Sequence, residues 1–147
     1  MIYLIGSLRN PEIPKLAERL RASLNEEVFD DWFAAGPEAD DKWRDYERHR
    51  GHSFVDALSG YAARHVFAFD KYHLERADKV VLALPAGKSG HLELGWALGR
   101  GTPGYILTNE PERFDVMYQF ATGVYDKEGD LIESLRSGPM GGARKGG

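Results

Sequence analysis

The feature that most constrains the fold of this chain is the run Lys79-Val80-Val81-Leu82-Ala83-Leu84. A nearly continuous apolar run of this length is typical of a central strand that is buried on both faces of a parallel sheet. Because parallel strands are joined by crossover connections, helices are expected before and after it. The run therefore predicts an α/β fold.

The rest of the chain repeats this alternation of strand and helix. Apolar runs indicate further strands at 2–5, 28–29, 105–107 and 124–125, and helical spacing indicates helices at 11–24, 61–77, 91–100, 115–121 and 128–135. Residues 1–137 are predicted to form one domain, a flavodoxin-like or Rossmann-like parallel sheet of about five strands flanked by helices. The glycine-rich, basic segment 138–147 is predicted to be a disordered tail.

Between residues 34 and 60 the regular pattern is lost. This segment is polar and highly charged, and it carries Trp43, Tyr46, His49 and His52. Long irregular connections inside compact domains are usually functional or disordered. We predict a substrate-covering loop here, with or without a short helix.

Composition excludes several classes of protein. The net charge of -4 at pH 7 argues against a nucleic-acid polymer as partner, because phosphate backbones require a concentrated basic face. The chain has no cysteine, which excludes disulfides, thiol catalysis and cysteine-bound zinc. No run approaches the length of a membrane span and no signal peptide is recognisable, so a cytoplasmic protein is expected.

Loops that follow the strands are the expected place for a ligand, because ligands of such sheets bind beyond the carboxyl ends of the strands. Glycines there permit tight turns, while hydroxyls and basic side chains suit a phosphate. Neither the loop after the first strand nor the loop at 85–90 has the spacing of a Walker motif or of a dinucleotide-binding fingerprint. The candidate substrate-binding residues are Gly6, Ser7, Arg9, Asp31, Trp32, Phe33, Gly87, Lys88 and Ser89.

Two carboxylates are candidates for catalysis. Glu93 is expected in or near the first turn of the helix after the central strand, where backbone N–H groups and the helix dipole favour an ionised side chain. Asp70 is expected on the preceding helix. Cleavage of a glycosidic bond requires one group that receives the sugar and another that manages protons at the leaving group. Position alone favours ordinary helix-surface roles for both residues.

Other catalytic constellations find little support. His49 and His52, with Asp45 or Asp56 nearby, are too few organised ligands for a zinc site, so solvated histidines are expected and no metal is predicted. No serine lies in a G-x-S-x-G elbow, which argues against a hydrolase triad.

Three segments resemble the nucleoside 2-deoxyribosyltransferase family and the related 2'-deoxynucleoside 5'-phosphate N-hydrolases. They are Ile2-Tyr3-Leu4-Ile5-Gly6-Ser7-Leu8-Arg9, Asp70-Lys71-Tyr72-His73-Leu74-Glu75-Arg76-Ala77-Asp78-Lys79-Val80-Val81, and Ser89-Gly90-His91-Leu92-Glu93-Leu94-Gly95-Trp96-Ala97. The resemblance implies that Glu93 is the nucleophile and that Asp70 binds the sugar or delivers a proton to the base. It departs from the transferases in the loop before Glu93, which has no carboxylate to recognise a base, and the loop after the first strand looks closer to that of the N-hydrolases.

The resemblance implies cleavage of the N-glycosidic bond of a 2'-deoxynucleoside or its 5'-monophosphate, with hydrolysis or transfer of the deoxyribosyl group to another base. It implies no metal or organic cofactor. It also implies a homo-oligomer whose neighbouring subunit completes the site, with Asn109, Tyr118 and Tyr125 as candidates. Two alternatives stay open: a nucleotide-sensing module that binds without turnover, and a glycohydrolase acting on a ribonucleotide or NAD.

Overall fold

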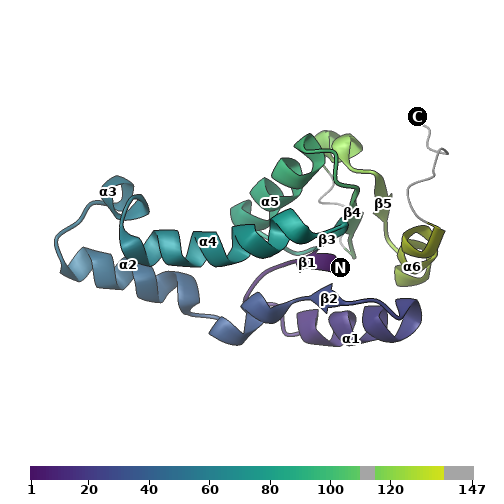
Figure 1. Ribbon diagram of the computed structural model, residues 1–147, viewed down its shortest axis with the longest axis horizontal. Helices are drawn as coiled ribbons and strands as arrows, with labels where there is room; N and C mark the ends of the chain where they lie inside the picture. Colours follow the sequence, from purple (N-terminus) through teal and green to yellow (C-terminus); the bar gives the residue numbers. More distant parts are fainter. Residues whose placement is uncertain (110–114, 138–147) are drawn as a thin grey trace.

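Strands and helices alternate along the chain, as the sequence predicts (Figure 1). The computed structural model describes residues 1–109 and 115–137, and the predicted tail at 138–147 lies outside these residues. The strands are β1 (Ile2–Ile5), β2 (Val28–Phe29), β3 (Lys79–Ala83), β4 (Gly104–Leu107) and β5 (Gly123–Tyr125). The helices are α1 (Ile13–Leu24), α2 (Ala39–His49), α3 (Phe54–Leu58), α4 (Tyr61–Arg76), α5 (Lys88–Gly99) and α6 (Glu128–Ser137), with short 3-10 helices η1 (Asp31–Ala35) and η3 (Val116–Phe120).

The strands form one parallel sheet in the order β2-β1-β3-β4-β5. This confirms the predicted α/β fold with a five-stranded parallel sheet flanked by helices. β1 and β3 are neighbours, with Tyr3 aligned with Val80 and Ile5 with Leu82. After β1 the chain continues to β2 on one side, whereas after β3 it continues to β4 on the other. The loops at the carboxyl ends of β1 and β3 therefore diverge, which is where sheets of this kind bind ligands.

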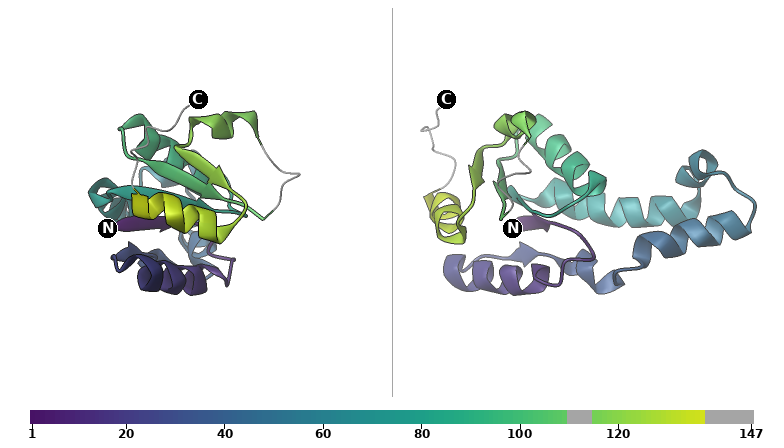
Figure 2. Two further views of the ribbon diagram at one scale, coloured as in Figure 1. Left: turned by 90° about the vertical axis from the view of Figure 1, so that its right-hand side faces the viewer. Right: turned by 180° about the vertical axis from the view of Figure 1, so that it is seen from behind.

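Alternate residues along each strand face opposite layers of helices. From β1, Ile2 and Leu4 pack in the core formed with α1 and α6, whereas Tyr3 and Ile5 belong to the core formed with α4 and α5. Figure 2 shows the two layers on either side of the strands. Any side chain of α4 or α5 that reaches the sheet therefore meets Tyr3 rather than Leu4.

The segment 34–60, predicted as a loop, is largely helical. It contains α2 and α3, which together with the first part of α4 project beyond the sheet as an arm (Figures 1 and 2). The prediction is wrong because α2 buries only Glu47 and so shows no apolar stripe in the sequence. Ion pairs with three-residue spacing support the helix instead: Arg44 with Asp41, and Arg48 with Asp45, each at 2.9 Å.

α1 begins slightly later than predicted. The side chain of Asn10 accepts the Glu12 N–H at 3.0 Å and closes a turn before the helix, which then starts at Ile13. The predicted helix at 115–121 is the short 3-10 helix η3. Both differences concern element ends, where local side-chain bonds compete with the helix.

α5 begins earlier than predicted, at Lys88 rather than at His91. Gly87 precedes the helix, and Ser89 and Gly90 are part of it. Glu93 consequently lies in the second turn. The positive end of the helix dipole acts mainly within the first turn, so it stabilises the Glu93 carboxylate less than the sequence led us to expect.

Large apolar side chains are exposed on α4 and α5. Phe67 is 66%, Leu92 74% and Trp96 38% exposed. Lys71, one turn after Phe67 on α4, lies over the ring of Trp96 on α5, with Nζ 6.0 Å from the ring centroid. We therefore place Phe67, Leu92 and Trp96 on one surface and call it the α4–α5 patch. Despite such apolar surface, no helix within residues 1–109 and 115–137 is long and apolar enough to cross a lipid bilayer.

Candidate active site

Glu93 and Tyr3 meet on the face of the sheet that α4 and α5 cover. The Tyr3 hydroxyl donates a hydrogen bond to Glu93 Oε2 at 3.0 Å. Tyr3 is buried within β1 and Glu93 is partly buried on α5. The bond fixes one carboxylate oxygen and leaves Oε1 available to another partner.

The close approach of α5 to the sheet depends on Gly90. A Cβ atom at this position would lie 3.1 Å from Ile5 Cγ2 and 3.1 Å from Leu82 Cδ1, closer than ordinary van der Waals contact. Glycine therefore lets α5 rest directly on β1 and β3. This contact brings Glu93, on the next turn of the helix, within reach of Tyr3.

Asp70 on α4 is the second carboxylate of the candidate site. Its negative charge is close enough to raise the pKa of Glu93 and of Tyr3. Asp40, in the first turn of α2, acts on Glu93 and on Asp70 in the same sense. The structure thus brings Asp70 and Glu93 within electrostatic reach of each other, and it adds Asp40 to them.

Both carboxylates bind protons more tightly than ordinary acids. Burial is the main reason that the pKa of Glu93 is raised to about 7. The negative charge of Asp70, and to a smaller extent that of Asp40, raises this pKa further, whereas the hydrogen bond from Tyr3 lowers it. Burial, and then the charge of Asp40, raise the pKa of Asp70 to about 6. The sequence predicted an ionised Glu93, and this is corrected: burial raises its pKa, so the carboxylate is only partly ionised at neutral pH.

Tyr3 remains a hydrogen-bond donor at any physiological pH. Burial, the negative charges of Glu93 and Asp70, and the hydrogen bond to Glu93 all raise the pKa of its phenol above the usual range. A neutral phenol beside a carboxylate stabilises the charged form of that carboxylate. Tyr3 thus counteracts part of the burial that favours protonated Glu93.

Tyr3→Phe is expected to raise the pKa of Glu93 further, by about one pH unit, because the ring is kept and only the donor is lost. The measurement is an NMR titration of the carboxyl carbon of Glu93. Tyr105→Phe is the matched control, since Tyr105 is equally buried but faces the α1 and α6 layer. A pKa of Glu93 that falls or stays unchanged in Tyr3→Phe would contradict the role given to this hydrogen bond.

The predicted aromatic contacts lie in η1 and are already used by the fold. The indole Nε1 of Trp32 donates to the Leu4 carbonyl at 2.8 Å, and its ring packs against both cores. Phe33 packs against the core on the α1 and α6 side, so the structure does not bring it to Glu93. Asp31 is exposed at the start of η1. Of the three, Trp32 is the residue that reaches the face of the sheet where Glu93 lies.

The glycine-containing loops contribute backbone shape and exposed donors. A Cβ atom at Gly6 would collide with the end of the Ile13 side chain, so glycine lets the loop after β1 pass close to α1 without moving that side chain. Ser7 Oγ accepts a hydrogen bond from the Arg9 N–H, and the Arg9 guanidinium is paired with Asp41. Gly87, Lys88 and Ser89 are exposed at the start of α5.

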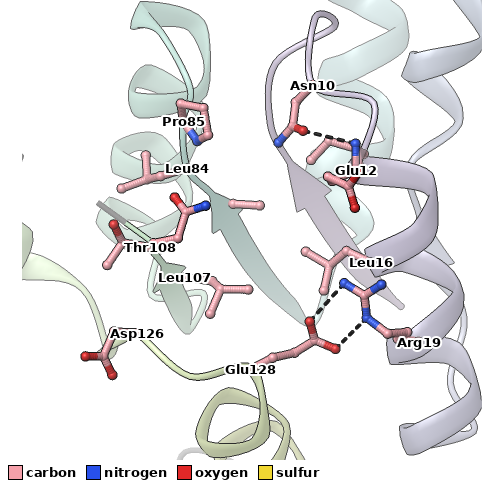
Figure 3. A pocket seen from close by; sticks show the side chains of 13 residues that line it. Asn10, Glu12, Leu16, Arg19, Leu84, Pro85, Leu107, Thr108, Asp126 and Glu128 are labelled. Carbon is pink, nitrogen blue, oxygen red and sulfur yellow. Dashed lines mark hydrogen bonds and ion pairs between the residues drawn. The ribbon is translucent and has the colours of Figure 1, made fainter. Parts of the chain in front are cut away.

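Two cavities lie outside the carboxylate pair. One, of about 330 Å³, is on the α1 and α6 side at the carboxyl ends of β3 and β4, and the bidentate ion pair of Arg19 with Glu128 joins the helices beside it (Figure 3). The other, of about 340 Å³, lies between α5 and η3. Neither is lined by Glu93 or Asp70. The perturbed carboxylates and the hydrogen bond between Tyr3 and Glu93, rather than cavity size, indicate the candidate site.

The residues expected to complete a neighbour's site differ in their surroundings. The Tyr118 hydroxyl lies 2.8 Å from His91 Nε2, and the Tyr125 hydroxyl lies 2.6 Å from Ser134 Oγ, so both take part in the packing of their own chain. Asn109 is exposed and lines the cavity beside α1. Asn109 is thus the one of the three whose exposed position best suits contact with a second copy.

The histidines of the arm are engaged with neighbouring groups. His52 Nδ1 lies 2.7 Å from Oε1 of the buried Glu47, and His49 Nδ1 lies 2.8 Å from the Asp45 carbonyl. Across the described residues, no group of three or more histidine, cysteine, aspartate or glutamate side chains is arranged to hold a metal ion.

Sequence inspection missed Tyr3, Asp40 and Asp41. Tyr3 was counted only as a strand residue, although a phenol in an otherwise aliphatic buried strand needs a hydrogen-bond partner. Asp40 and Asp41 lie in the first turn of a helix that was predicted as loop. An acidic pair before regularly spaced arginines is the signal from which that helix start could have been found.

The architecture described above defines the class: a parallel α/β sheet with a carboxylate-bearing helix next to the central strands. The sequence matches no protein-family model, and it matches none of the curated proteins. Among solved structures, the chain is similar to a 2-deoxyribosyltransferase from the psychrotolerant bacterium Bacillus psychrosaccharolyticus, with 18% identity and a TM-score of 0.60 over 90% of each chain. It is also similar to a conserved protein from Enterococcus faecalis V583, with 16% identity and a TM-score of 0.60 over 92% of this chain and 96% of that one. The chain therefore has the fold of a 2-deoxyribosyltransferase.

Proposed function

We propose that this protein cleaves the N-glycosidic bond of a 2'-deoxynucleoside or its 5'-monophosphate, with Glu93 as nucleophile and Asp70 as the second catalytic carboxylate. The observation that carries the proposal is the partly buried pair Glu93 and Asp70, with pKa values of about 7 and about 6, of which Glu93 accepts a hydrogen bond from Tyr3. Glycosidic-bond cleavage uses two carboxyl groups in one site, one ionised as the nucleophile and one that carries a proton to the leaving group. The fold shared with a 2-deoxyribosyltransferase supports the choice of sugar.

In the first step, ionised Glu93 attacks C1' of the 2-deoxyribosyl group through Oε1, the oxygen that Tyr3 does not hold. A C–O bond forms as the C1'–N bond breaks, and the electron pair of that bond leaves with the base. Between about pH 6 and pH 7 the two carboxyl groups hold about one proton between them, and in the reactive form this proton is on Asp70, which donates it to the base directly or through a water molecule. The product is a glycosyl ester on Glu93.

In the second step, water or a second base attacks C1' and releases Glu93 as a carboxylate. Asp70, now ionised, accepts the proton from the attacking nucleophile. Two displacements at C1' retain the configuration of the sugar. Water as acceptor makes the enzyme a hydrolase, and a base as acceptor makes it a transferase.

The loops at the carboxyl ends of β1 and β3 are proposed to hold the rest of the substrate. Gly6, Ser7 and Arg9 belong to one loop, and Gly87 with exposed Lys88 and Ser89 to the other. Asp31, Trp32 and Phe33 were also predicted as substrate contacts, and of these Trp32 is retained in the proposal. A cytoplasmic location stays a prediction, which cell fractionation would test.

A second copy of the chain is proposed to cover the α4–α5 patch. Phe67, Leu92 and Trp96 are exposed there, and each lies within one helical turn of Asp70 or Glu93. Contiguous exposed apolar surface of this kind marks interfaces. A partner on this surface would exclude water from the carboxylates, and so would complete the site.

Phe67→Asp is expected to lower the mass of the protein in solution to that of one chain and to lower turnover, because it places a charge in the apolar interface. Light scattering after size exclusion measures the mass. Val55→Asp on α3, which is 75% exposed, is the matched control and should leave the mass unchanged. A wild-type protein that is monomeric and fully active would contradict the proposal.

The proposed function is tested with a panel of deoxynucleosides and deoxynucleoside 5'-monophosphates, with and without a second free base, and products read by liquid chromatography. Free base released without an acceptor identifies a hydrolase, and product only in the presence of an acceptor identifies a transferase. Ribonucleotides and NAD in the same panel test the glycohydrolase alternative. Clear ligand binding without turnover would favour the sensing module and contradict the proposal.

A further inference from the structure

Several backbone N–H groups of the loop after β1 and of the turn that follows it bond within the protein. Ser7 O accepts the Asn10 N–H at 3.0 Å, and Ser7 Oγ accepts the Arg9 N–H at 3.1 Å. Asn10 in turn accepts the Glu12 N–H through its side chain and the Ile13 N–H through its carbonyl, at 3.0 and 3.2 Å. These N–H groups are therefore not available to an anion, although the composition of the loop suggested a phosphate site.

The guanidinium of Arg9 also has a partner within the protein. Arg9 Nη2 lies 3.1 Å from Asp41 Oδ2, and the second oxygen of Asp41 accepts Arg44 Nη2 at 2.9 Å. Asp41 thus lies between two arginines in the first turn of α2 and ties the loop after β1 to the arm. With the neighbouring Asp40, the two arginines and two aspartates carry no net charge.

A 5'-phosphate would enter an environment that is already negative. Glu93 and Asp70 are the proposed catalytic groups, and the charge of Asp40 raises the pKa of both. A phosphate carries close to two negative charges at neutral pH. It would repel these carboxylates unless a cation compensates; Arg9 is paired with Asp41, which leaves the exposed Lys88 as the other cation of the two substrate loops. An uncharged nucleoside meets no such cost.

We propose that Asp41 is a specificity-determining residue: by holding Arg9, it makes the site favour an uncharged 2'-deoxynucleoside over the corresponding 5'-monophosphate. This inference rests on the proposed function, because it assumes that the substrate is a deoxynucleoside or its phosphate. Removing the charge of Asp41 would free the forked donors of Arg9, which match a phosphate in geometry and charge. Lys88 and Ser89, exposed at the start of α5, would be unchanged by that substitution.

The test compares wild type with Asp41→Asn, using the four common deoxynucleosides and their 5'-monophosphates. The measured quantity is the ratio of kcat/KM for each monophosphate to that for its nucleoside. We expect this ratio to be below one in wild type and to rise about tenfold in Asp41→Asn. The double variant Arg9→Gln with Asp41→Asn should lose the gain, since the freed guanidinium is then absent.

Asp40→Asn is the matched control, because Asp40 is the adjacent acid of the same turn. Its removal should shift the pH dependence of turnover to lower pH, through the pKa of Glu93 and Asp70, and should change the substrate ratio less than Asp41→Asn does. A wild type that prefers the monophosphate, or an unchanged ratio in Asp41→Asn, would overturn the inference while leaving the proposed function intact.

Calorimetric binding of the same eight ligands separates failure of the inference from failure of the proposed function. If no substrate is turned over, the ratio of the dissociation constants in wild type and Asp41→Asn still reports on Asp41, and a tighter monophosphate complex in the variant would support its role. If none of the ligands binds, both proposals fall.

Discussion

Replacing Glu93 with glutamine is expected to lower turnover by about 10⁴-fold or more, because an amide does not form the glycosyl ester on which the proposed mechanism depends. Glutamine has nearly the same size and its amide oxygen still accepts the hydroxyl of Tyr3, so the fold is expected to persist. Single-turnover assays with the best substrate of the panel measure the effect. Near-normal turnover in Glu93→Gln would remove Glu93 as nucleophile.

The same substitution is expected to stabilise the folded protein at alkaline pH. The pKa of Glu93 is about 7 in the folded chain and near the ordinary value of 4.5 in the unfolded chain. The folded state therefore binds more protons between these values, and the wild type loses stability as the pH rises through this window. Glutamine does not ionise, so its stability advantage grows from pH 4.5 to pH 7 and is about 3 kcal/mol above that.

Urea unfolding of wild type and Glu93→Gln at pH 4 and at pH 8 measures this difference. The two proteins should be about equally stable at pH 4, and the variant should be the more stable at pH 8. Glu75→Gln is the matched control on the neighbouring helix α4, since Glu75 is exposed and should give little change at either pH. A variant that is less stable than wild type at pH 8 would contradict a Glu93 whose ionisation opposes folding.

The pattern of apolar residues predicted the strands of the sheet well, because a strand that is buried on both faces appears in the sequence as a continuous apolar run. The runs around Val81 and Leu4 are fully buried in β3 and β1, and the helices that cover them carry apolar residues at regular spacing. The proximity of Asp70 to Glu93 was also predictable, since both helices flank the same central strand. These features depend on local pattern and on the rules of parallel sheets.

The arm was not predictable from apolar pattern, because helices that project from a sheet have little to bury. Only Glu47 of α2 is buried, and the exposed Phe67 on α4 obeys no core-facing period. Such a segment reads as polar loop until charge spacing is examined. The partners of Arg9 were missed for the same reason, because Asp41 belongs to this helix.

The ionisation state of Glu93 in the candidate site was also not predictable from the sequence. Whether a carboxylate at a helix start is ionised depends on the turn that carries it and on how deeply it is buried. Gly90 brings α5 close to the sheet, so Glu93 lies against buried Tyr3 instead of facing solvent at the first turn. Burial follows from that contact between distant segments, and the raised pKa of Glu93 follows from burial.

Asp70→Asn is expected to lower turnover by about 10² to 10³-fold, because an amide neither donates a proton to the leaving base nor accepts one from the attacking nucleophile. The pH dependence should change as well. After burial, the charge of Asp70 is the largest cause of the raised pKa of Glu93, so the variant should ionise Glu93 at lower pH. The acid limb of the kcat/KM profile, which reports the coupled pair in the free enzyme, should therefore move to lower pH.

An activated 2-deoxyribosyl donor separates proton transfer from sugar binding as the role of Asp70. If the leaving group departs as a stable anion, it needs no proton, and Asp70→Asn should then lose far less activity than with a natural base. Asp40→Asn should move the acid limb in the same direction with a smaller loss of turnover, because Asp40 also raises the pKa of Glu93 but takes no part in the proposed chemistry. Equal losses with activated and natural donors would assign Asp70 to binding the sugar. An acid limb that stays in place or moves to higher pH in Asp70→Asn would contradict the conclusion that the charge of Asp70 raises the pKa of Glu93.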